Sequence, residues 1–203
     1  MKTYFITGIG TDVGKSIISA ILTEALEADY WKPIQAGDLD NSDTKKVQDL
    51  ISNNKSVFHN EAYKLTEPMS PHAAARIDNI EIDINTIKIP ETNNNLIIEG
   101  AGGLMVPLND KDLILDLIKS LDVETVLVSQ NYLGSINHTL LSIEILKLKG
   151  IKVKGIIFNG EENIETEKYI LNYSKLPCIG RVKQHTTINK EVILQYKNDF
   201  NFE

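Results

Sequence analysis

The chain has 203 residues, of which 42% are hydrophobic and 24% are charged, and its formal net charge is -7. This length suits one globular domain that spans residues 1–203, and the composition excludes a disordered or fibrous chain. The negative charge repels nucleic acids, and the sequence holds no basic run with interleaved aromatic residues that would offset it. We therefore expect no nucleic-acid partner.

The sequence also argues against secretion and membrane insertion. Cys178 is the single cysteine, so no internal disulfide can form, and we expect it to be a small buried hydrophobic residue in a reducing compartment. The N-terminal apolar run is too short for a signal peptide, and no stretch reaches the ~20 apolar residues that a membrane span needs. We therefore expect a cytoplasmic protein with no membrane partner.

Strand-like and helix-like patterns alternate along the chain. Short runs rich in β-branched and aromatic residues predict strands at 3–7, 29–32, 95–99, 125–129, 153–158 and 178–182. Amphipathic patterns predict helices at 15–27, 42–52, 112–121, 135–149, 162–173 and 188–196. The stretch 54–94 is irregular and predicts loop with a short helix. Because the strand runs are continuously apolar, we predict an α/β fold with three layers, α/β/α, around a mostly parallel central sheet.

The segment GIGTDVGKS, residues 8–16, follows the first predicted strand and opens the first predicted helix. Glycines let the backbone curl around phosphates, and the free N–H groups at a helix start attract anions. Lys15 is expected to reach the β- and γ-phosphates of ATP, and the hydroxyl of Ser16 to ligate magnesium. One departure is that Gly8 and Gly14 enclose five residues, whereas the common pattern has four. The segment predicts a variant phosphate loop, and with it a fold of the P-loop NTPase type.

Two other interpretations of this loop stay open. A helix that merely starts with Gly-Lys-Ser would give the same letters without binding a ligand. A dinucleotide-binding turn would use Gly8, Gly10 and Gly14, but Val13 occupies its third glycine position. The second strand also ends in Lys32 rather than in an acidic residue, which leaves only a weak case for NADP.

Three more polar residues are candidates for the same site. Glu99 ends a buried strand before a run of glycines, and the ligand crevice of an open α/β sheet lies at that end of the strands. We expect Glu99 to meet the same magnesium as Ser16, since magnesium prefers carboxylate oxygens; the alternative is a solvated charge. Lys32 would neutralise charge on a transferred phosphoryl group, or simply be solvated. Asp43 by itself favours a helix-start acid or N-cap.

These motifs, taken together and in this order, resemble the dethiobiotin synthetase family. The matching segments are GTDVGKS at 10–16, KPIQAG at 32–37, NSD at 41–43, EPMSPH at 67–72, EGAGGLMVPL at 99–108, LGSINHT at 133–139 and FNG at 158–160. The combination covers nearly the whole chain and is far more specific than any one motif.

The resemblance implies an ATP-dependent ligase that forms carbon–nitrogen bonds, with Mg²⁺ as cofactor. In that family one amine of 7,8-diaminopelargonate takes up carbon dioxide as a carbamate, and the carbamate attacks the γ-phosphoryl group of ATP. The second amine then closes the ring of dethiobiotin, with ADP and phosphate as the other products.

The resemblance also implies which residues form the site. Lys32, Lys15 and Thr11 would be catalytic, and magnesium would be held by Ser16, Asp43 and Glu99. ATP would be bound by Asp12, Val13, Gly14, Lys15, Ser16, Ile17, Asp43, Glu99, Gly100, Ala101, Gly102, Asn159, Gly160, Lys183, Gln184 and His185. The substrate would be held by Thr11, Lys32, Ala36 and Gly103, together with Gly134, Ser135 and Asn137 of a partner subunit. A homodimer follows from that last group.

Three features depart from the family pattern. Ala36 stands where the family offers a hydroxyl to the substrate carboxylate, which leaves only the backbone N–H for that contact. Residues 183–185 stand where related chains carry a proline and an aromatic residue near the adenine. The loop between Gly37 and Asn41 is short, which leaves open where Asp43 lies relative to the magnesium.

Three other functions stay open. A nucleotide-switch ATPase of the partition or septum-positioning type shares the predicted fold, but Gly10 stands where such proteins carry an extra lysine. A related amide-forming ligase usually has an added glutaminase region, for which 203 residues leave no room. A non-catalytic nucleotide-binding relative is the third, and Ala36 is its best argument. The isolated histidines, at 59, 72, 138 and 185, are expected to be structural.

Overall fold

The computed structural model describes residues 1–202 and has a seven-stranded sheet at its centre. Every strand pairing in this sheet is parallel, and the order is β4-β2-β6-β1-β7-β8-β9. Its strands are β1 (Thr3–Gly8), β2 (Asp29–Trp31), β4 (Phe58–His59), β6 (Leu96–Gly103), β7 (Glu124–Gln130), β8 (Val153–Asn159) and β9 (Cys178–Val182). A second parallel pair joins β3 (Ile34–Ala36) to β5 (Tyr63–Leu65). The prediction of a mostly parallel sheet is therefore confirmed.

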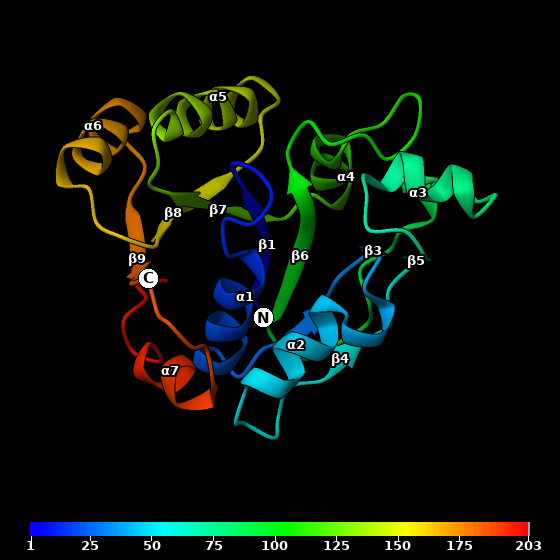
Figure 1. The fold of residues 1–203 in the computed structure, drawn as a ribbon, viewed down its shortest axis with the longest axis horizontal. Helices are drawn as coiled ribbons and strands as arrows, with labels where there is room; N and C mark the ends of the chain where they lie inside the picture. Colours follow the sequence, from blue (N-terminus) through cyan, green and yellow to red (C-terminus); the bar gives the residue numbers. More distant parts are fainter. Residues whose placement is uncertain (203) are drawn as a thin grey trace.

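Helices cover both faces of the large sheet (Figure 1). They are α1 (Lys15–Ala25), α2 (Asp43–Leu50), α3 (Pro71–Ile77), α4 (Ile114–Leu121), α5 (Ser135–Leu148), α6 (Ile164–Ser174) and α7 (Lys190–Gln195), with 3-10 turns η1 (Leu39–Asn41) and η2 (Ile84–Thr86). On one face, Ile18 of α1 packs in a buried cluster with Ile97 of β6. On the other, Ile143 of α5 packs in a cluster with Leu127 of β7. The predicted three layers are therefore present.

All six predicted strands and all six predicted helices form, with shifted ends. The third predicted strand continues through the glycines as far as Gly103. The helix expected from 162 begins at Ile164, because Asn163 caps it with a side-chain oxygen that accepts a hydrogen bond from the N–H of Thr166. The stretch 54–94 contains the expected short helix, α3. It also contains β4 and β5, which like β3 are only two or three residues long, too short to show a periodic pattern.

The expectation that Cys178 is buried is wrong. Cys178 is the first residue of the edge strand β9 and is exposed, whereas the next residue, Ile179, is buried. Successive side chains of a strand point to opposite faces. In this edge strand the side chain of Ile179 faces the core, whereas that of Cys178 faces away from it.

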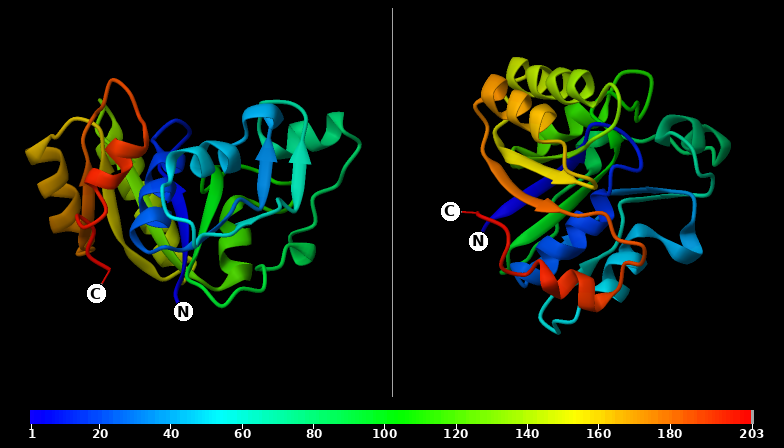
Figure 2. Two further views of the ribbon diagram at one scale, coloured as in Figure 1. Left: turned by 90° about the horizontal axis from the view of Figure 1, so that it is seen from below. Right: turned by 60° about the vertical axis from the view of Figure 1, so that its left-hand side comes forward.

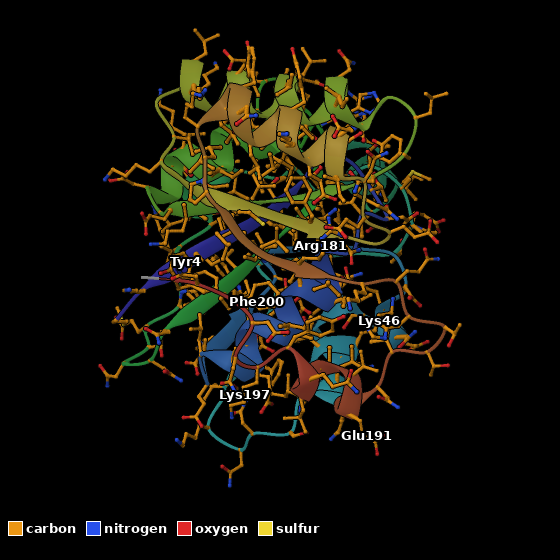
Figure 3. The ribbon with its side chains drawn as sticks, turned by 90° about the vertical axis from the view of Figure 1, so that its left-hand side faces the viewer. Tyr4, Lys46, Arg181, Glu191, Lys197 and Phe200 are labelled. Atoms are coloured by element: carbon orange, nitrogen blue, oxygen red, sulfur yellow. The ribbon has the colours of Figure 1, made fainter. Side chains whose placement is uncertain are left out.

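The two ends of the chain lie at the same edge of the molecule (Figure 2). Phe200 lies close to β9 (Figure 3), where a Cβ on Gly180 would come within 2.5 Å of its ring. The ring centroid of Phe202 is 5.0 Å from that of Tyr4. The C-terminal segment thus packs back on the sheet. Within residues 1–202, no helix combines the length and the apolar character that crossing a membrane requires.

Candidate active site

The glycine loop between β1 and α1 turns tightly. Asp12 and Gly14 have positive φ angles of 58° and 92°, and a Cβ on Gly14 would lie 2.2 Å from the side-chain nitrogen of Asn159. Glycine is therefore required at position 14 both by backbone conformation and by space. The ammonium group of Lys15 donates a hydrogen bond to the carbonyl of Gly10 at 2.8 Å. The first turn of α1 has no side-chain cap, so its N–H groups are free to attract an anion.

Charged side chains from two neighbouring strands meet beside this loop. Lys32 follows β2 directly and Glu99 lies in β6, and the two strands pair up to Trp31 and Ile98. Nζ of Lys32 lies 3.0 Å from Oε1 of Glu99 and 2.6 Å from Oδ2 of Asp43. The hydroxyl of Ser16 donates to the same Oε1 of Glu99 at 2.8 Å. Because Lys32 and Glu99 are only 4% and 1% exposed, these charges depend on one another for stabilisation.

The position of Asp43, which the short loop had left open, is set by two local contacts. Ser42 is the N-cap of α2, so Asp43 is the first helical residue rather than the cap. The buried side chain of Gln35 accepts a hydrogen bond from the N–H of Asp43 at 3.2 Å and donates one to the carbonyl of Gly37 at 2.9 Å. With its backbone held in this way, one carboxylate oxygen of Asp43 meets Lys32 and the other lies 3.6 Å from Nζ of Lys46.

The pKa values of the cluster follow from this burial and pairing. Burial alone would lower the pKa of Lys32, but the charges of Glu99 and Asp43 outweigh it and raise the pKa above its ordinary value. Burial lowers the pKa of Lys15 to about 8, and the charge of Glu99 only partly opposes it. Burial acts to raise the pKa of Asp43, but Lys32 brings it below the ordinary value. Burial and the charge of Glu99 raise the pKa of Tyr30 well above its usual range, so its hydroxyl stays protonated.

A cavity of about 720 Å³ opens beside this cluster and the loop. The predicted residues that line it are Thr11, Asp12, Gly14, Lys15, Ser16, Ile17, Lys32, Ala36, Asp43, Glu99, Ala101 and Gly102. Its other lining residues, which the site prediction missed, are Ile34, Gln35, Lys46, Pro68, Met69, Ser70, Pro71 and Val106. The segment EPMSPH carried part of the family resemblance and was the available signal for residues 68–71. Lys46 gave no such signal, because a lysine in a helix usually faces solvent.

Comparison with known proteins then decides the family. The protein-family model described as an AAA domain matches residues 2–192. The ATP-dependent dethiobiotin synthetase BioD of Christiangramia forsetii is 57% identical over 98% of this chain and 96% of its own. The BioD of Cytophaga hutchinsonii is 52% identical over 97% of this chain and 95% of its own. The chain belongs to the dethiobiotin synthetase family.

Solved structures confirm the fold that this family membership implies. A ParA family ATPase from Chlorobium tepidum superposes with a TM-score of 0.59 at 15% identity, and the match covers 97% of both chains. The septum site-determining protein MinD of Pyrococcus horikoshii, complexed with Mg-ADP, gives 0.55 at 13% identity over 96% of this chain and 85% of its own. At such identities the likeness shows the P-loop fold alone, so it lends no support to the nucleotide-switch alternative.

Several residues that the dethiobiotin synthetase pattern assigns to the site do not line this cavity: Val13, Gly100, Gly103, Asn159, Gly160, Lys183, Gln184 and His185. Asn159 lies behind the loop, where its side-chain nitrogen donates to the carbonyl of Val13 at 2.9 Å. The N–H of Lys183 donates to the hydroxyl of Tyr196 at 3.0 Å, and a ring nitrogen of His185 lies 2.6 Å from the same oxygen. Residues 183–185, which depart from the family pattern, are therefore held by Tyr196, the residue that follows α7.

The predicted partner-subunit residues lie apart from the main cavity. Gly134 and Asn137 line a second cavity, of about 870 Å³, at the start of α5. Ser135 is buried beside them, and its hydroxyl has no hydrogen-bond partner among residues 1–202. Leu133 and Ile136, which also line this cavity, are exposed. One chain by itself thus does not bring these residues to the cluster around Glu99.

No histidine among residues 1–202 lines either of the two cavities. His59 contacts Asp29 at 3.3 Å, and His138 lies 2.7 Å from the hydroxyl of Tyr132. Residues 1–202 also hold no group of three or more histidine, cysteine or acidic side chains suited to a metal ion.

Proposed function

We propose that the cavity beside the glycine loop is where this chain makes dethiobiotin, with residues 1–203 acting as one ligase domain in the cytoplasm. The observation that carries the proposal is the meeting of Lys15, Ser16, Lys32, Asp43 and Glu99 at one end of a cavity, in a member of this family. Phosphoryl transfer needs positioning and charge neutralisation more than a nucleophilic side chain, and this cluster offers both.

ATP would lie with its triphosphate against the glycine loop and the start of α1. The uncapped first turn of α1 supports this placement, as does Lys15, whose short bond to a loop carbonyl would be exchanged for bonds to phosphate oxygens. The adenine would lie toward Asn159, Gly160 and residues 183–185. The pairing of β8 with β9 supports this, because Asn159 pairs with Val182, and Tyr196 then holds the residues that follow.

Mg²⁺ would be held by Ser16, Asp43 and Glu99. A hydroxyl and two carboxylates are the oxygen ligands that this ion prefers, and waters usually complete its shell. The donor set fits, because Glu99 is buried and accepts hydrogen bonds from Ser16, Tyr30 and Lys32, which hold its oxygens in place. When bound, the ion would neutralise charge on the β- and γ-phosphates.

The reaction begins when one amine of diaminopelargonate adds to carbon dioxide and loses a proton, which gives a carbamate. A carbamate oxygen attacks the γ-phosphorus of ATP, ADP leaves, and a carbamic-phosphoric anhydride forms. The second amine attacks the carbamate carbon, loses a proton and expels phosphate, which closes the ring. Lys15 and Lys32 would stabilise charge on the transferred group, and Thr11 at the cavity wall would help to orient the substrate.

The substrate would be held between two chains. Thr11, Lys32 and Ala36 line the cavity from one chain, and Ala36 has no hydroxyl, so its N–H would make the contact. Gly103 lies against the loop and would add a backbone contact. Residues 134–137 of a second copy would complete the site, which makes the active enzyme a homodimer. The exposed apolar residues at the start of α5 support this arrangement, because clustered apolar surface marks interaction sites.

The test is a reaction with purified chain, diaminopelargonate, bicarbonate, ATP and magnesium, followed by mass spectrometry of dethiobiotin and a phosphate assay. We expect dethiobiotin and phosphate in equal amounts, and neither product when the diamine is left out. Phosphate release that does not depend on the diamine would refute the proposal.

A further inference from the structure

Tyr30 places a hydroxyl beside Glu99 from within the apolar core. It is the middle residue of β2 and is completely buried, and its ring centroid lies 5.7 Å from that of Phe58. Its hydroxyl donates a hydrogen bond to Oε2 of Glu99 at 3.0 Å. A tyrosine in a buried strand has the pattern of a core residue, so this role could not be inferred from the sequence.

This bond divides the two oxygens of Glu99 between different partners. Oε1 accepts hydrogen bonds from Ser16 and Lys32 at the cavity, whereas Oε2 accepts one from Tyr30. A carboxylate bonded at both oxygens cannot rotate without breaking a charge-assisted hydrogen bond. Oε1 is thereby kept turned toward the serine that we propose as a second magnesium ligand.

We propose that Tyr30 is a positioning residue for the magnesium site, whose buried hydroxyl fixes Glu99 so that Oε1 faces the cation. The inference rests on the proposed function, since it takes Glu99 as a ligand of the ion. Groups that orient metal ligands commonly contribute about 10–100-fold in metal affinity or activity. In Tyr30→Phe, Oε2 would be buried without a partner, and the carboxylate would be free to turn away from the cavity.

Tyr4 offers a matched control for this change. It pairs with Ile97 of β6 from one side, and Tyr30 pairs with the same residue from the other. Tyr4 is 1% exposed, and its hydroxyl has no hydrogen-bond partner in the described chain. In Figure 3 it lies on the opposite side of the view from Lys46, a cavity residue on α2. Tyr4→Phe therefore removes the same atom from the same sheet without disturbing the cluster.

The experiment uses the full chain and a non-hydrolysable ATP analogue, whose binding is measured by calorimetry over a series of Mg²⁺ concentrations and once with EDTA. In Tyr30→Phe we expect the half-saturating Mg²⁺ concentration to rise about tenfold, with the metal-free affinity close to wild type. In assays, the KM for Mg²⁺ should rise in the same proportion while the KM for diaminopelargonate stays unchanged. Tyr4→Phe should alter none of these values.

The unfolding temperature of each variant without ligand is measured in parallel. Tyr30→Phe with an unchanged Mg²⁺ half-saturation would overturn the inference, and so would failure of this variant to fold, since the hydroxyl would then serve the core rather than the cation. An equal Mg²⁺ effect in Tyr4→Phe would overturn it as well. Failure of the proposed function would show in the wild type itself, as analogue binding that is the same with and without Mg²⁺.

Discussion

The starts of α1 and α5 use the same backbone arrangement in different surroundings. Each follows a strand of the parallel sheet, and each helix begins after a glycine with positive φ, 92° at Gly14 and 102° at Gly134, without a side-chain cap. At α1 the next residues meet buried charges of the same chain. At α5 the neighbours are exposed apolar side chains such as Leu133. The start of α1 thus has its partners within the chain, whereas the start of α5 presents the surface on which we propose a second copy docks.

The largest effect should come from Lys15→Ala, at the start of α1, whose partners all lie within one chain. The variant keeps the loop glycines but loses the cation that we place on the phosphates. Dethiobiotin formation should fall on the order of 100–1000-fold, measured by mass spectrometry of the product. Turnover close to wild type would contradict the loop assignment.

The next largest effect concerns the start of α5, which we propose is completed by a second copy. Leu133→Asp puts a charge into the apolar surface at the start of α5, so the proposed dimer should dissociate and turnover should fall about tenfold or more. Binding of the ATP analogue should persist, because the glycine loop belongs to one chain. Leu148→Asp, at the other end of α5 and also exposed, is the matched control. Sedimentation equilibrium that shows a Leu133→Asp dimer, or a monomeric and active wild type, would argue against the shared site.

The third prediction concerns pH and follows from the pKa of Lys15, which burial lowers to about 8. Lys15 is charged below that pH and neutral above it, and a triphosphate binds the charged form. Affinity for the ATP analogue should therefore be constant below pH 7 and fall about fivefold between pH 8 and 9. Calorimetry across this range checks it, with Lys15→Arg, which stays charged, as the control. A flat profile for the wild type would rule out Lys15 as the titrating contact.

The smallest effect compares two serines, one at each helix start. Ser16→Ala removes a hydrogen bond to the buried carboxylate of Glu99 and should lower the free energy of unfolding by about 1.5 kcal/mol. Ser135→Ala removes a buried hydroxyl without a partner in the described chain, so it should leave the free energy of unfolding unchanged or raise it, by about 1 kcal/mol at most. Urea unfolding of both variants at one protein concentration measures the difference. An equal loss in the free energy of unfolding for both variants would contradict this difference between the starts of α1 and α5.

The residues whose position follows from local rules were predictable from the sequence. The glycine loop stands between a strand and a helix, Lys32 follows β2 directly, and Glu99 was predicted at a strand end although β6 continues to Gly103. The rule for parallel sheets brings the ligand-binding ends of such strands to one edge. That β2 and β6 are neighbours comes from the structure, because the sequence predicts the strands but not their order in the sheet. The α/β layers were predictable, because hydrophobic periodicity reports on local burial.

Tertiary structure decided what depends on contacts between distant segments. The bond from Tyr30 to Glu99 spans 69 residues, and only the packed structure shows that Gln35 accepts a hydrogen bond from the N–H of Asp43 and that the carboxylate of Asp43 meets Lys32. Short strands such as β4 exist because a neighbouring strand offers hydrogen bonds, and Cys178 is exposed because β9 lies at the sheet edge. Sequence patterns report how each segment is buried along its own length, whereas these features depend on which segments meet.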